Sequence, residues 1–113
     1  MRKILWFSRH EMTPEQAAAL GEDVEIMQIN KSITSAFELK EEIEAADVIA
    51  VVAPIQLQQQ FLKLAGNKPV IMAVNDRVFV PDPNGGESKV AFQFVKWERL
   101  VRIDVVKEDY IPV

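Results

Sequence analysis

The stretch Lys3-Ile4-Leu5-Trp6-Phe7, followed by Ser8-Arg9-His10 and then by Thr13-Pro14-Glu15-Gln16, decides the fold class of this chain. The apolar run 3–7 predicts a buried first strand. Thr13 is a good helix N-cap, with Gln16 placed to close a capping box and a proline in the first helical turn. In an open α/β sheet, ligands bind beyond the carboxyl end of a strand, close to backbone N–H groups that favour anions. The polar loop Ser8-Arg9-His10, with the only imidazole of the chain, is therefore the strongest candidate site.

The following sequence alternates between strand-like and helix-like patterns. Further strands are predicted over 24–29, 48–53 and 70–74, and the helices over 13–20, 35–46 and 57–64. Four strands alternating with three helices indicate an α/β fold with a mainly parallel sheet and right-handed crossovers.

The last third of the chain has a different pattern. Residues 78–80, 89–95 and 100–106 are predicted to be strands, the first two joined by the Pro/Gly-rich turn 81–86. This piece is too short to be a domain, so it is expected to form an antiparallel extension of the sheet. We therefore expect one α/β domain over residues 1–113.

Composition narrows the possible functions. The 113 residues include six Phe and two Trp, enough for one hydrophobic core. The net charge of −4 offers no broad attraction to duplex nucleic acid or to anionic lipid. The lack of cysteine excludes disulfides, thiolate metal sites and cysteine nucleophiles. Neither a signal peptide nor an apolar run of membrane-spanning length is present, so a cytoplasmic protein without a membrane partner is expected.

Polar residues also follow the other predicted parallel strands. Asn30-Lys31-Ser32 follows the second strand, Pro54-Ile55-Gln56 the third and Asn75-Asp76-Arg77 the fourth. Because the carboxyl ends of parallel strands meet at one edge, these segments are expected on the same side as Ser8-Arg9-His10. Taken singly, each segment is consistent with an ordinary loop. Together, their amides, hydroxyls and cations are suited to contact a phosphate group and the edges of a nucleotide base. Gln58-Gln59-Gln60 is predicted to be the solvated side of the third helix.

His10 has two interpretations, a structural residue beside a helix start or a catalytic acid or base, since imidazole exchanges protons near neutral pH. A histidine-phosphatase mechanism needs a second histidine, and the chain has one. A zinc centre would lack enough nitrogen and sulfur ligands. Asp76 alone is a weak basis for a magnesium site. We therefore expect neither a metal nor another cofactor.

The apolar strand ending in Ser8-Arg9-His10, with the helix start Thr13-Pro14-Glu15-Gln16, resembles the Ser-x-His and Thr/Ser-x-Glu-Gln motifs of small single-domain CRISPR-associated ring nucleases. The resemblance extends in outline to Asp47-Val48-Ile49 and to Lys68-Pro69-Val70, and the C-terminal third is outside it. It implies a CARF-like, Rossmann-type fold and a homodimer. Such a dimer binds a cyclic oligoadenylate across its two-fold axis and cleaves it without metal, which ends type III CRISPR signalling. Phage and mobile elements carry related proteins, some of which only sequester the messenger.

The resemblance implies a reaction in which a ribose 2′-OH attacks its own adjacent phosphate. Arg9 and Lys31 would hold the phosphate, and His10 would act as general acid or base. Ser8 and Asn75 would orient the ribose-phosphate, while Asn30 and Gln56 would contact adenine edges. The catalytic candidates are thus Ser8, Arg9 and His10, and the ligand-binding candidates are Asn30, Lys31, Gln56, Asn75 and Arg77. A protein that only sequesters a nucleotide signal, and a partner-binding protein with no nucleotide ligand, are the alternatives.

Overall fold

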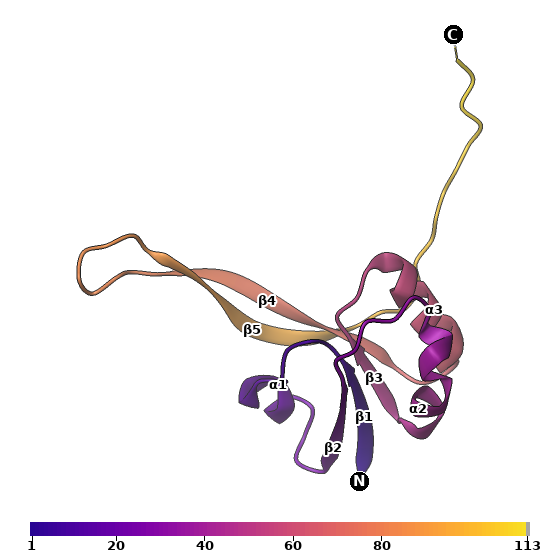
Figure 1. Cartoon of the computed structure of the whole chain (residues 1–113), viewed down its shortest axis with the longest axis horizontal. Helices are drawn as coiled ribbons and strands as arrows, with labels where there is room; N and C mark the ends of the chain where they lie inside the picture. Colours follow the sequence, from indigo (N-terminus) through magenta and orange to yellow (C-terminus); the bar gives the residue numbers. More distant parts are fainter. Residues whose placement is uncertain (113) are drawn as a thin grey trace.

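The computed structural model describes residues 1–112 and shows an α/β fold built on one five-stranded mixed sheet (Figure 1). The sheet order is β2-β1-β3-β4-β5; the first four strands are parallel to their neighbours and β5 is antiparallel to β4. The strands are β1 (Arg2–Phe7), β2 (Val24–Ile29), β3 (Val48–Val51), β4 (Val70–Val80) and β5 (Lys89–Arg99). The helices are α1 (Pro14–Ala18), α2 (Lys40–Ala45) and α3 (Ile55–Ala65), and a 3₁₀ turn, η1 (Ala36–Leu39), precedes α2.

The capping box predicted for Thr13 and Gln16 is present, and the structure has a second one. The Thr13 hydroxyl accepts a hydrogen bond from the Gln16 N–H at 3.2 Å, and the Gln16 side chain accepts one from the Thr13 N–H at 3.0 Å. Ser35 and Glu38 form the second box at the start of η1. Backbone N–H groups of Thr34 and Ser35 donate to Glu38 and hold the pKa of its carboxyl below the usual range. These local contacts determine where the helical segments begin.

Helices cover both faces of the sheet, and each face has its own core. On one face, α2 and α3 pack on β1 and β3, and the ring of the fully buried Phe61 lies 5.3 Å from that of Phe7. On the other face, Trp6 and Trp97 meet edge to face at 5.8 Å. The Trp97 indole N–H donates to the Gln16 carbonyl at 3.0 Å, which ties α1 to β5.

The chain reverses its direction across the sheet next to β1. It passes from β1 through α1 to β2 on one side, and then through α2 to β3 on the other side of β1. The loops that leave β1 and β3 therefore diverge to opposite faces. In open α/β sheets, this divergence leaves a crevice beyond the carboxyl ends of the strands where ligands bind.

The predicted parallel strands and helices are confirmed, but two predictions for the last part are wrong. Asn75-Asp76-Arg77 does not follow the fourth strand; it lies inside β4, which continues to Val80 because β5 pairs with its whole length through an irregularity at Val74/Asn75. The strand predicted over 100–106 is absent. The Leu100 N–H still donates to the Val70 carbonyl at 2.8 Å, but residues 101–106 pair with no described strand.

The polar side of α3 also differs from the prediction. Gln60 accepts a hydrogen bond from the Ala36 N–H at 2.7 Å, and Gln58 donates to the Ala53 carbonyl at 2.7 Å. Both side chains therefore satisfy backbone groups of neighbouring segments, in addition to meeting solvent. Within residues 1–112, no helix has the length and apolar character needed to cross a bilayer.

Candidate functional site

The loop Ser8-Arg9-His10 is held in place by side chains of β1 and β2. The Trp6 indole N–H donates to the His10 carbonyl at 2.8 Å, and the Gln28 amide lies 3.1 Å from both the Ser8 and His10 carbonyls. Ser8 is buried, and its hydroxyl accepts a hydrogen bond from the His10 N–H at 3.1 Å. The backbone of the loop is therefore fixed, while the side chains of Arg9 and His10 are exposed.

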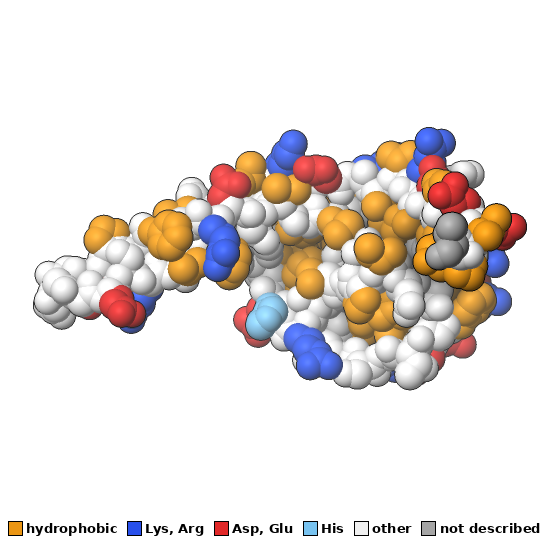
Figure 2. All heavy atoms as spheres, turned by 90° about the horizontal axis from the view of Figure 1, so that it is seen from above, with side chains coloured by type: hydrophobic (Ala, Val, Ile, Leu, Met, Phe, Trp, Pro, Cys, Tyr) orange, Lys and Arg blue, Asp and Glu red, His pale blue; other side chains and the backbone are white. Residues whose placement is uncertain are grey.

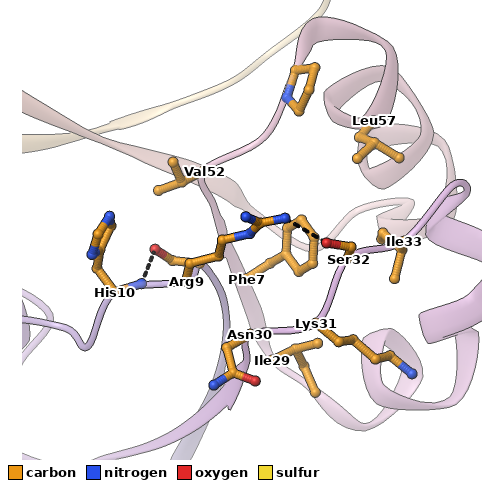
Figure 3. Close-up of a pocket in the computed structure, with 12 residues that line it drawn as sticks. Phe7, Arg9, His10, Ile29, Asn30, Lys31, Ser32, Ile33, Val52 and Leu57 are labelled. Carbon is orange, nitrogen blue, oxygen red and sulfur yellow. Dashed lines mark hydrogen bonds between the residues drawn. The ribbon is translucent and has the colours of Figure 1, made fainter.

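A hollow of about 340 Å³ opens beside this loop at the crevice between the strand ends (Figure 3). Its walls come from the carboxyl ends of β1, β2 and β3 and from the start of α3. The residues that line it are Phe7, Ser8, Arg9, His10, Ile29, Asn30, Lys31, Ser32, Ile33, Val52, Pro54 and Leu57. No carboxylate is among these described lining residues, so the hollow combines an apolar floor with cations and amide groups.

Arg9 is the most directly placed cation of the hollow. Its guanidinium points across the opening and donates a hydrogen bond to the Ser32 hydroxyl (Figure 3). Within residues 1–112 it forms no salt bridge. A guanidinium that has neutral partners retains N–H donors for the oxygens of an incoming phosphate.

Lys31 and Asn30 line the same hollow but have a different orientation. The Lys31 ammonium points away from the guanidinium of Arg9 (Figure 3). Its positive charge contributes to lowering the pKa of the Glu38 carboxyl. Lys31 would therefore have to turn from Glu38 to reach a ligand held by Arg9.

His10 lies between this hollow and a second one of similar volume. The second hollow opens on the other side of the loop and is lined by Ser8, His10, Glu11 and Asn75, among others. Asn75 thus lies near the predicted site even though it belongs to β4. The imidazole ring forms no hydrogen bond within residues 1–112, so no described side chain orients it in that way. Glu11 brings a carboxylate to the second hollow, and for this reason an anion is better accommodated in the first.

Two of the predicted ligand residues are not brought to either hollow. Gln56 is exposed near the start of α3, and Arg77 is exposed in β4 opposite Phe92 of β5. Two important residues were missed as well. Ser32 pairs with Arg9, and Gln28 holds the loop. The signal for Gln28 was a polar residue next to the end of a predicted strand, because a polar side chain there commonly satisfies backbone groups.

Within residues 1–112, no three histidine, aspartate or glutamate side chains gather as they would around a metal ion. Comparisons with family models, with curated proteins and with solved structures give no match to this chain.

Proposed function

We propose that this chain has a Rossmann-like, CARF-like fold and, as a homodimer, binds a cyclic oligoadenylate at the carboxyl-end face of its sheet and cleaves it without a metal ion. The main support for this proposal is the set of residues that line the first hollow. Arg9, Lys31 and Asn30 supply cations and an amide, and no described lining residue is acidic. An electropositive hollow with an apolar floor suits a ligand that combines phosphate with a flat base.

The position and size of the hollow support the same ligand class. The hollow lies where the strand order reverses, as ligand sites do in doubly wound sheets. Its volume of about 340 Å³ is at the small end of the range of ligand pockets, so it suits one nucleotide unit of a larger ring. Two hollows related by a two-fold axis would hold two units of a symmetric ring.

The proposed reaction is an internal transfer of the phosphoryl group. The 2′-oxygen forms a bond to its neighbouring phosphorus, and the bond from phosphorus to the 5′-oxygen of the next nucleotide breaks. The 2′-OH loses a proton and the departing 5′-oxygen gains one, which leaves a 2′,3′-cyclic phosphate and a 5′-OH. His10 transfers one of these protons, and Arg9 stabilises the charge that builds up on the phosphate oxygens.

Incubation with cyclic tetraadenylate and cyclic hexaadenylate, followed by product analysis, tests the proposal. Arg9→Ala should weaken binding about ten- to a hundredfold, because it removes a charge-assisted hydrogen bond to phosphate. His10→Ala should retain binding and lower turnover by roughly a hundred- to ten-thousandfold, since proton transfer matters only in the transition state. Arg99→Ala is the matched control, because Arg99 is exposed at the end of β5 and lines neither hollow.

A sequestering protein is the second candidate function. One observation favours it: no residue of the described chain orients the His10 ring, whereas catalytic bases are usually held by a third group. Binding with intact ligand would establish sequestration and refute cleavage. If neither ring binds, the nucleotide proposal fails, and a partner-binding role without nucleotide becomes the better interpretation.

A further inference from the structure

Two parts of the chain project from the body. They are the hairpin arm, residues 75–94, and the C-terminal segment, residues 100–112 (Figure 1). The radius of gyration is 17.6 Å, whereas a compact domain of this length has a value of about 13 Å. The accessible area of 8520 Å² exceeds by about 2,200 Å² that of a compact monomer of this mass. The two projecting parts explain why so much surface meets solvent.

The hairpin arm has an apolar face. Phe79 pairs with Val90, and Phe92 pairs with Arg77 two positions further in, so the three apolar side chains share one face. Phe79 and Phe92 are 70% and 71% exposed. Toward the body, this apolar strip reaches Phe94, whose ring lies 5.6 Å from that of Trp97. Large apolar strips of this kind on a soluble protein mark interaction surfaces.

The C-terminal segment has a strand pattern but no strand partner among the described residues. Val101, Ile103 and Val105 alternate with Arg102 and Asp104, and these two charged residues pair with each other at 3.1 Å. The segment passes α3 and then leaves the body (Figure 1). Ile103 is half-buried, but Val101 and Val105 are 78% and 63% exposed, so these two valines need a surface that the described body of the same chain does not provide.

We infer that a second copy of this chain binds between the two projecting parts. The hairpin arm and the C-terminal segment of each copy then pack against the body of the other copy. The accessible area that the chain has in excess of a compact monomer is larger than the approximately 800 Å² that each partner buries in a standard interface. A two-fold contact lets both copies cover their apolar surfaces at once. Charges of both signs on the arm and segment, such as Asp76, Arg77, Arg102 and Asp104, make nucleic acid a poor occupant.

The second copy would face the candidate site. Seen from above, the hairpin arm, the single histidine and the apolar side chains of the body lie on one continuous face (Figure 2). Exposed Val52 and Ile55 border the first hollow and its α3 wall on the body. A copy seated on this face would close the hollow with its own residues. The inference builds on the homodimer of the proposed function, but it requires no nucleotide.

Sedimentation and light scattering of the full chain test the inference. The parent protein should be a dimer at micromolar concentration, with twice the chain mass of 12.8 kDa. Phe92→Lys and Val101→Lys should each raise the dimer dissociation constant by about a hundredfold or more, because each places a charge in a contact that the dimer buries. Phe37→Lys is the matched control: Phe37 is 57% exposed on η1, outside both projecting parts, and its variant should stay dimeric.

Circular dichroism of each variant shows whether it is folded, and Phe92→Ala replaces Phe92→Lys if the lysine variant unfolds. A monomeric parent protein, a Phe92 variant that stays dimeric, or a Phe37 variant that dissociates equally would each overturn the inference. The nucleotide assays separate this result from the proposed function. A dimer that depends on the projecting parts but binds no cyclic oligoadenylate supports the inference and refutes that function. A dimer that binds cyclic oligoadenylate and survives both lysine substitutions does the opposite.

Discussion

Replacing Gln28 by methionine should loosen the loop that carries Arg9 and His10. The Gln28 amide lies 3.1 Å from both the Ser8 and the His10 carbonyl, and methionine keeps the length of the side chain while it removes the donors. Each neutral hydrogen bond contributes about 0.5–1.5 kcal/mol, and the partial exposure of this pair favours the lower half of that range. We therefore expect the free energy of unfolding to fall by about 1–2 kcal/mol.

Urea denaturation measures this loss, and titration with cyclic oligoadenylate measures its effect on the site. Because the ligand would have to order the loosened loop, binding should weaken up to about tenfold, which corresponds to 1.4 kcal/mol. Gln59→Met is the matched control, since Gln59 is half-buried on α3 and makes no side-chain hydrogen bond within residues 1–112; its effect should stay within about 0.5 kcal/mol. Equal urea midpoints for the two variants would show that Trp6 and Ser8 hold the loop without Gln28.

Two further predictions concern metal independence and acid sensitivity. Cleavage of cyclic oligoadenylate should survive EDTA, because the described residues contain no cluster of metal ligands; loss of activity that Mg²⁺ restores would point to Asp76 as a ligand. The carboxyl of Glu38 has a lowered pKa in the folded chain. Its ionised form therefore stabilises the fold at pH values above the usual pKa of a glutamate, and this stabilisation is lost as the pH falls through the lowered pKa. The parent protein should therefore unfold at higher urea than Glu38→Gln at neutral pH, and the difference should shrink in acid; a constant difference would contradict this assignment.

The first three quarters of the fold follow from local features of the sequence. The apolar runs in β1 and β3 are nearly continuous because both faces of these strands are covered. The box between Thr13 and Gln16 joins residues three positions apart, so the start of α1 can be predicted without knowledge of the rest of the chain. The loop Ser8-Arg9-His10 is predicted for the same reason, because it lies between a recognisable strand and a recognisable helix start.

The pairing of segments that are distant in the sequence depends on the tertiary structure. Asn75 and Arg77 belong to β4 because β5 supplies hydrogen-bond partners along its whole length, a contact between segments that no local pattern specifies. The same pairing carries Arg77 away from the site on the hairpin arm but leaves Asn75 beside His10. Which segments are apolar and where the helices begin can be predicted from local sequence, because periodicity and capping act over a few residues. Tertiary structure determined which polar side chains meet, because strand pairing depends on the free energy of the whole sheet.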